Sequence, residues 1–313
     1  MCMLRLITRR TLSLAFVLFS LTFLTFVVSH LAPGDPILNL MGGRHDPARY
    51  AFLRHLYGFD QPWYWQYLSY VGGLLRGQLG LSFKYPERPV WSLLAAGLPV
   101  SLGLGGAALL VSLVVGVSAG VLAALWHNTW RDAALMGLML VLYSVPSFVL
   151  IPLLWLATLW LYNAGLPALP VAGWGRPEHW VLPVAVLAAS NAGYIARLMR
   201  SSLLEVLRQD FVRTARAKGV PEWLVLRRHV LRNALLPLLT LLGPASAFLV
   251  TGAFVVENLF AIPGIGFLTV QSIGQRDYPV IQATTLLLGA AVVFMNLLAD
   301  LAYAAADPRI RFE

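Results

Sequence analysis

The sequence predicts an all-α protein with six membrane-spanning helices. Three observations lead to this prediction: 58% of the 313 residues are hydrophobic, only 12% are charged, and long apolar stretches recur along the chain. Soluble globular chains carry about 25% charged residues, and a span needs about 20 mostly apolar residues to cross the bilayer. The composition therefore excludes a cytosolic enzyme, and the aromatic content excludes a disordered chain.

Six apolar stretches define the predicted spans. None contains Lys, Arg, Asp or Glu; the fourth is shorter than the others but continues beyond Arg197 as an amphipathic helix. The first follows three arginines, yet it is too long for a signal peptide and no small-residue cleavage site follows it. The stretches are Thr11–Ser29, Gly97–Leu125, Ala133–Tyr162, Trp180–Ala196, Asn233–Val256 and Tyr278–Ala299.

Lys and Arg set the predicted orientation, because the cytoplasmic loops of membrane proteins are enriched in both. With the N-terminus inside, 15 basic residues fall on the cytoplasmic side and 8 on the outer side. Both termini are therefore expected to face the cytoplasm. The net charge of +9 is explained by this loop bias, so we expect no nucleic-acid partner.

Polar segments divide the chain further. We expect an N-terminal helix over residues 1–31, an outer cap over 32–96, a transmembrane core over 97–305 and a cytoplasmic tail over 306–313. The outer cap is either an interfacial cap with aromatic side chains at headgroup level or a docking surface that faces the solute. Its clustered aromatic residues are Trp63, Tyr64, Trp65, Tyr67 and Tyr70.

Small residues and prolines predict how the spans pack. Gly116 and Gly120 form a G-x-x-x-G pair, which allows helices to approach closely in lipid; we favour packing within the chain over dimerisation. Five prolines are expected to interrupt helical hydrogen bonding, as is common where transporter helices are broken: Pro146, Pro152, Pro183, Pro237 and Pro244.

The motifs of common catalytic sites are missing. The chain has only two lysines, and neither lies in the G-x-x-x-x-G-K-[ST] pattern that binds nucleotide phosphates. The six histidines show no metal-ligand spacing, the one cysteine is Cys2, and there is no G-x-S-x-G motif. We therefore predict no catalytic residues, no metal and no cofactor. Glu257, at the outer end of the fifth span, is either bonded to nearby backbone or part of a gate.

The cytoplasmic segment from residue 197 to residue 232 carries 9 of the 23 basic residues. A helix is predicted to end at Gly219, which suits a left-handed C-terminal cap, and Pro221 begins a second helix. From Trp223 onward, apolar residues alternate with Arg227, Arg228 and Arg232, so this helix is amphipathic and not a span. It could lie on the membrane surface or insert into a groove of a partner.

This segment resembles the E-A-A-x-x-x-G loop of ABC importer permeases, in the form found in the dipeptide, oligopeptide and nickel subclass. Thr214, Ala215 and Gly219 fall on family positions; Arg213 replaces the leading Glu, and Arg232 stands where a proline is expected. Seven further motifs, in family order, are L-A-P-G-D-P (31–36), Y-G-F-D-Q-P (57–62), G-L-L-R-G-Q-L-G (73–80), S-V-P-S-F (144–148), V-V-E-N-L-F-A-I-P-G-I-G (255–266), R-D-Y-P-V-I-Q (276–282) and D-P-R-I-R (307–311).

The resemblance implies a type I importer permease in a bacterial inner membrane. It implies a homologous permease as the second half of the pore, cytoplasmic ABC ATPase subunits and an extracellular solute-binding protein as partners. The inner loop would form a coupling helix that docks on the ATPase, and residues 260–266 would form a re-entrant loop near the path or, alternatively, an ordinary loop. The coupling candidates are Ala215, Gly219, Val220, Trp223, Leu224, Arg227 and Arg228, and the gate candidates are Glu257, Phe260, Pro263 and Gly264.

Within this subclass we expect peptides or similar small solutes. Importers of nickel, glutathione and oligosaccharides stay open as alternatives. Outside the subclass, a secondary transporter or channel is the first rival, and a membrane-embedded enzyme is the second.

Overall fold

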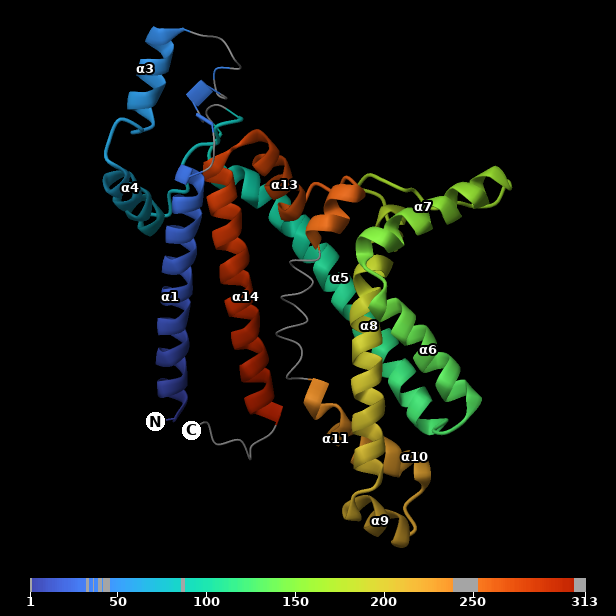
Figure 1. The fold of residues 1–313 in the computed structure, drawn as a ribbon. Helices are drawn as coiled ribbons and strands as arrows, with labels where there is room; N and C mark the ends of the chain where they lie inside the picture. Colours follow the sequence, from blue (N-terminus) through green and yellow to red (C-terminus); the bar gives the residue numbers. More distant parts are fainter. Residues whose placement is uncertain are drawn as a thin grey trace. The chain divides into compact units, whose positions relative to one another are not determined.

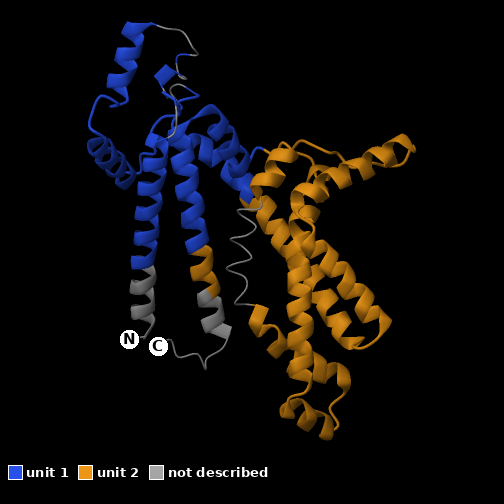
Figure 2. Cartoon of the chain, viewed as in Figure 1, with its two compact units in different colours: residues 1–101, 263–293 blue, residues 102–262, 294–313 orange. Residues whose placement is uncertain are grey.

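The computed structural model describes residues 2–31, 34–35, 37–38, 41, 46–85, 88–238 and 253–306, with side chains from residue 12 to residue 299. The chain forms two compact units (Figure 2). Unit 1 comprises residues 1–101 and 263–293, and unit 2 comprises residues 102–262 and 294–313. Over the described ranges the regular structure is helical, with a single antiparallel bridge between Leu81 and Pro89.

Unit 1 is organised around two long helices that lie side by side, α1 (Cys2–Leu31) and the first part of α14 (Tyr278–Ala306) (Figure 1). They pack closely because Gly289 has no side chain; a Cβ there would meet Leu21 at 2.1 Å. The buried Tyr67 ring packs against phenylalanine rings of α1. The remaining helices of unit 1 are α3 (Pro47–Leu56), α4 (Trp63–Leu75), the start of α5 (Val90–Leu125) and α13 (Ile265–Gln275).

Unit 2 is built on α8 (Glu178–Leu207). A Cβ at Gly116 would lie 2.7 Å from Ile195, and one at Gly120 would lie 2.6 Å from the Ala196 carbonyl oxygen. The G-x-x-x-G pair of α5 therefore packs against α8, which confirms packing within the chain. The other helices are α6 (Trp130–Ser144), α7 (Ser147–Asn163), α9 (Asp210–Ala217), α10 (Glu222–Leu224), the π-helix η1 (Val225–Leu231) and α11 (Arg232–Ala234).

Four of the predicted spans are confirmed as helices long and apolar enough to cross a membrane: Leu12–Leu31, Val90–Leu125, Glu178–Leu207 and Tyr278–Ala299. The fourth predicted span continues past Arg197 as expected. The fifth, Asn233–Val256, lies largely outside the described residues. The division of the chain at residues 31, 96 and 305 stays a prediction.

The third predicted span is broken at Pro146, which confirms the interruption predicted there. Its halves α6 and α7 meet at an angle of 108°. Val145 is extended, at φ −78° and ψ 118°, because a residue before proline is kept out of the helical region. Pro152 and Pro183 were also expected to interrupt helices, yet both lie inside α7 and α8; each removes a single backbone donor, and the flanking turns keep theirs.

Candidate coupling surface and outer loop

The first half of the predicted coupling segment is α9, an eight-residue helix with a defined end. The Gly219 N–H donates to the Arg216 carbonyl at 2.9 Å, and the Val220 N–H donates to the Ala215 carbonyl at 3.3 Å. These two bonds form a Schellman motif, which requires a left-handed residue after the helix. Gly219 supplies it with φ +76°, which confirms the predicted cap.

A charged pair bridges this turn. The Arg216 guanidinium donates to both Glu222 carboxylate oxygens, at 3.1 and 2.5 Å. Glu222 lies in the first turn after Pro221, so the pair joins the end of one helix to the start of the next. Both side chains are about half exposed, at 43% and 64%, and such pairs contribute about 0.2–1 kcal/mol. The pair fixes the angle of the turn more than it stabilises the fold.

The strength of this bridge should depend on pH. The hydrogen bond from Arg216 holds the pKa of the Glu222 carboxyl below its ordinary value of 4.5. A lowered folded-state pKa means that the stabilisation is complete above pH 4.5 and is lost as the pH falls through that lowered pKa. We expect the amides of residues 217–220 and 222 to exchange faster in Glu222→Gln than in wild type above about pH 5, and equally fast once the wild-type carboxyl is protonated. A difference that persists in that protonated state would contradict this account.

The second half of the segment, residues 222–234, is a continuous helical stretch that packs on the end of α8. Val225 and Val230 are fully buried and share one core cluster with Met199 and Leu203 of α8. The Ser202 hydroxyl donates to the Ala234 carbonyl at 3.0 Å. The stretch is therefore fastened to the end of α8 by both packing and a hydrogen bond.

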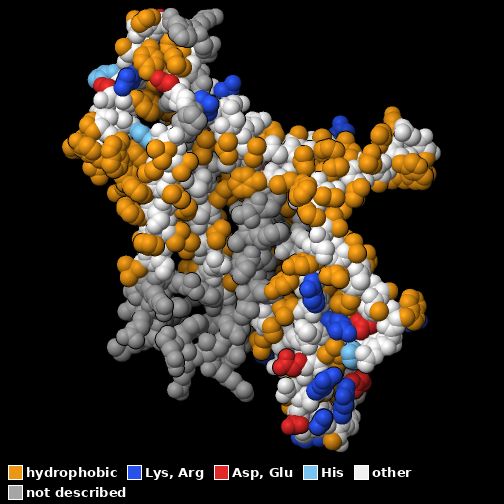
Figure 3. Space-filling view, in the orientation of Figure 1, with side chains coloured by type: hydrophobic (Ala, Val, Ile, Leu, Met, Phe, Trp, Pro, Cys, Tyr) orange, Lys and Arg blue, Asp and Glu red, His pale blue; other side chains and the backbone are white. Residues whose placement is uncertain are grey.

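The structure divides the coupling candidates into a buried and an exposed group. Ala215 is buried, at 7% exposure, and packs inside the chain. Gly219, Arg227 and Arg228 are exposed, and the Trp223 side chain is 64% exposed. Val220 and Leu224 are half-buried. Figure 3 shows Lys and Arg side chains gathered over this end of unit 2.

One further exposed aromatic residue of this surface was missed by the sequence reasoning. Phe211 of α9 is 43% exposed, although an apolar residue in an amphipathic helix is normally assigned to the core. We use the name coupling surface for five exposed residues of the predicted coupling segment: Phe211, Gly219, Trp223, Arg227 and Arg228.

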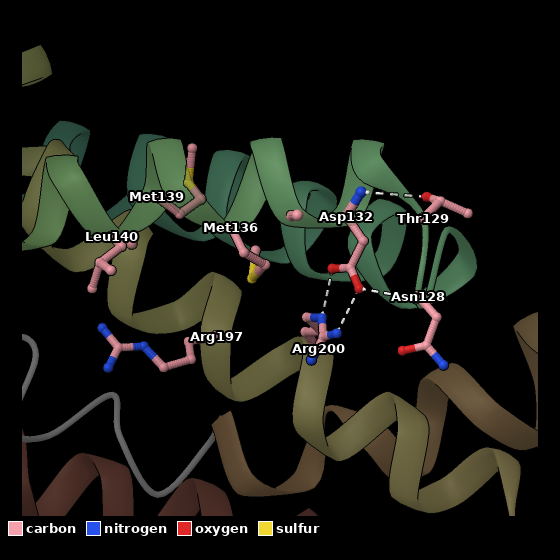
Figure 4. Close-up of a pocket in the computed structure, with 10 residues that line it drawn as sticks. Asn128, Thr129, Asp132, Met136, Met139, Leu140, Arg197 and Arg200 are labelled. Carbon is pink, nitrogen blue, oxygen red and sulfur yellow. Dashed lines mark hydrogen bonds and ion pairs between the residues drawn. The ribbon is translucent and has the colours of Figure 1, made fainter.

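The α5–α6 turn is tied to α8 by a buried ion pair (Figure 4). The Arg200 guanidinium donates to both Asp132 carboxylate oxygens, at 2.7 and 2.6 Å, and Asp132 is 5% exposed. Thr129 caps α6 and accepts from the Asp132 N–H. Removing one partner of such a pair leaves a buried charge unpaired, so the pair fixes the start of α6 on the part of α8 that precedes α9.

The gate candidates Glu257 and Phe260 are both buried in unit 2, at 0% and 1% exposure. Helix 253–259 ends with the Ile262 N–H donating to the Glu257 carbonyl at 2.8 Å. The Gly173 N–H donates to the Phe260 carbonyl at 2.9 Å, and the Phe260 ring stacks edge-on against Trp155. The loop after the fifth predicted span is thus anchored to the 164–177 loop.

Pro263 and Gly264 belong to unit 1. Pro263 is exposed, and Gly264 is the buried N-cap of α13. The Ser101 hydroxyl accepts from the Ile265 N–H at 2.8 Å, and a Cβ at Gly97 would lie 3.1 Å from the Gly264 carbonyl carbon. The predicted loop therefore leads into a helix of 11 residues, which the sequence analysis did not foresee and which is too short to span the membrane.

A buried carboxylate of unit 1 was also missed. Asp277 is 1% exposed and accepts from the Ser82 hydroxyl, from the Phe83 N–H at 3.0 Å and from the Lys84 N–H at 3.2 Å. It fastens the 81–85 loop to the start of α14. Within the R-D-Y-P-V-I-Q motif, the acidic residue therefore has a structural role.

Two family models match the chain along most of its length. Residues 116–312 match the binding-protein-dependent transport system inner membrane component, and residues 3–105 match the N-terminal region of such membrane components. The chain belongs to this family. It is a multi-pass permease of an ABC importer, and the resemblance drawn from the sequence motifs is confirmed.

Characterised relatives align with the permease from end to end. It is 40% identical over 309 residues to the dipeptide transport system permease protein DppB of Bacillus subtilis, covering 99% of this chain and 98% of the relative. It is 41% identical over 313 residues to the oligopeptide permease OppB of Salmonella typhimurium, with 99% and 100% covered. It is 38% identical over 311 residues to the glutathione permease GsiC of Escherichia coli O6:H1, again with 99% and 100% covered.

The fold of the permease also matches a solved importer. An inward-facing structure of the MetNI methionine ABC transporter superposes with a TM-score of 0.57 at 20% identity, covering 69% of this chain and 97% of that chain. The type I permease fold predicted from the sequence is therefore confirmed.

Proposed function

We propose that this permease forms half of the translocation pore of an ATP-driven importer of peptides, powered by separate ATPase subunits. The observation that carries the proposal is the coupling surface: an exposed aromatic and basic face on a helix pair whose buried side is packed on α8. Relatives named as dipeptide and oligopeptide permeases support the choice of solute.

The coupling surface would work as a lever. The Trp223 side chain would insert into a groove on the ATPase, and Gly219, which has no side chain, would let the two backbones approach closely. Arg227 and Arg228 would pair with acidic groups of the ATPase. Val220 and Leu224 line the edge of the contact, while Ala215 holds the surface from inside. A push on this face reaches α8 through the Ser202–Ala234 bond and the shared core.

The outer loop would close the other end of the path. Glu257 and Phe260 are buried at the end of helix 253–259, and Pro263 and Gly264 link it to α13. We propose that this segment moves with the spans that carry it and gates the outer opening. A homologous permease would complete the pore, an external solute-binding protein would deliver the solute, and both termini would face the cytoplasm.

The test of this function is uptake by a reconstituted complex. The permease is purified together with its neighbouring subunits, placed in proteoliposomes with ATP on the side of the coupling surface, and supplied with the binding protein and a labelled dipeptide. We expect uptake that requires ATP, the ATPase subunits and the binding protein together. Uptake by the purified chain alone under an ion gradient would instead identify a secondary transporter.

The solute is tested in the same vesicles by competition. Unlabelled dipeptides and oligopeptides should suppress uptake, and nickel or oligosaccharide should not. Glutathione is the second candidate, because the permease is 38% identical to GsiC. Stronger competition by glutathione than by the peptides would reassign the solute but leave the transport mechanism in place.

A further inference from the structure

A groove of about 620 Å³ lies between α6 and α8 in unit 2 (Figure 4). It forms where Gly193 lets the two helices touch; a Cβ there would come within 2.3 Å of the Met139 carbonyl oxygen. Met136, Met139 and Leu140 make its apolar wall, and Asn128 and Thr129 lie at its polar end. The volume is in the range of small-molecule sites. We call it the α6/α8 groove.

Two arginines one turn apart line the groove in different electrostatic states. Arg200 is neutralised by Asp132. The Arg197 guanidinium lies 4.8 Å from the centre of the Tyr143 ring, and among the residues that the structure describes it pairs with no carboxylate. Figure 4 shows Arg197 beside the apolar wall, apart from the Asp132–Arg200 pair. The groove therefore carries a positive charge whose N–H donors face outward.

The surroundings of the groove are those of a membrane boundary. Leu138, Leu140 and Val141 of α6 are each more than half exposed, as expected of side chains that face hydrocarbon. At the polar end, Arg131 lies over the rings of Trp126 and Trp130, and Trp is enriched at headgroup level. Arg197 lies three residues, about 4.5 Å of helix rise, deeper than Arg200.

We propose that the α6/α8 groove binds an anionic glycerophospholipid of the cytoplasmic leaflet. Its phosphate accepts hydrogen bonds from Arg197, and one acyl chain extends past Leu140 along the exposed apolar face of α6 at Val141. The charge of the groove matches an anionic headgroup, and its apolar wall continues into the exposed apolar face of α6. The leaflet follows from the orientation given under the proposed function; binding itself does not depend on it.

The test is native mass spectrometry of the purified permease complex with phosphatidylglycerol and with phosphatidylcholine of the same acyl chains. Wild type should retain phosphatidylglycerol preferentially. Arg197→Gln should weaken that binding about fivefold, the usual contribution of one basic residue near an anionic membrane surface, and Arg197→Lys should keep most of it. The control is Arg131→Gln, an exposed arginine at the start of α6 that does not line the groove; it should bind like wild type.

A second variant keeps the proposal falsifiable if Arg197→Gln does not fold. Leu140→Asn changes an exposed residue, retains Arg197 and should still weaken lipid retention. If Arg197→Gln and Arg131→Gln lost lipid binding equally, the binding would reflect only the general attraction of anionic lipid to positive charge. That result would overturn the proposed site. Displacement of the lipid by glycerol 3-phosphate at equal concentration would show a phosphate site without lipid, which also overturns it. Lipid retention is measured without transport. A failure of the uptake test would therefore not change how the lipid-binding results are interpreted.

Discussion

Replacing Gly219 with Trp is expected to abolish most ATP-driven uptake while the permease still inserts and assembles. Gly219 is exposed, and nothing lies within 4 Å of the position that its Cβ would take, so the new side chain projects from the coupling surface instead of into the core. Overfilling a packed contact costs about 1–3 kcal/mol, which corresponds to a loss of roughly fivefold to a hundredfold in docking. The measurements are uptake and ATPase stimulation in the same proteoliposomes.

Two controls separate bulk from backbone strain. Gly219→Ala introduces the same left-handed strain, about 1–2 kcal/mol, with almost no bulk, and should retain most activity. Gly165→Trp places the same side chain on another glycine of positive φ, +71°, with open space around it, on the far side of the predicted membrane. Uptake by Gly219→Trp at the wild-type rate, or an equal loss in Gly165→Trp, would rule out coupling through this surface.

Asp277→Ala is expected to release the 81–85 loop and to lower the stability of unit 1 by about 3 kcal/mol or more. The carboxylate accepts three hydrogen bonds while 1% exposed, and a hydrogen bond to a charged group contributes about 1.5–3 kcal/mol. Without it, the Phe83 and Lys84 N–H groups lose their acceptor. The measurement is the thermal unfolding midpoint, together with amide exchange at residues 83 and 84.

A graded series makes this prediction specific. Asp277→Asn keeps the shape but turns one acceptor into a donor, so its effect should be intermediate; Ser82→Ala removes one bond and should have the smallest effect. The matched control is Asp60→Ala, a carboxylate 42% exposed and paired with His55 on the same part of the chain, which should change little. Unchanged exchange at residues 83 and 84 in Asp277→Ala would refute the role of this residue.

The long helices could be predicted because an apolar stretch of about 20 residues in a bilayer must satisfy its backbone hydrogen bonds internally, which favours a helix. Gly219 was recognisable as a cap because a single local requirement, a positive φ, selects glycine. The break at Pro146 was predicted, but the same reasoning failed at Pro152, because proline can end a helix or lie within one. Local sequence does not distinguish these cases; the neighbours of the helix do.

The functional residues could be predicted from the sequence only where the residues that act together lie close together in the chain. Trp223 and the arginines of the coupling surface were found from the helical period of their own segment. Asp277 meets its partners across a sequence separation of 195 residues, and Asp132 meets Arg200 across 68. No periodicity links such positions, and a lone acidic residue near the end of a span looks the same in sequence whether it is solvated or buried.

The wide helical turn over Val225–Leu231 has a consequence for how the coupling surface can be adjusted. Its backbone bonds reach back five residues instead of four, so the turn holds one residue more than an α-helix would. If the wide turn shifted by one position along the chain, the residues that it passed would rotate by about 100° with no net loss of helical bonds. The side chains of Arg227 and Arg228 could thus change direction relative to a partner while the hydrogen bond between Ser202 and Ala234 stays in place. The helix would remain continuous throughout.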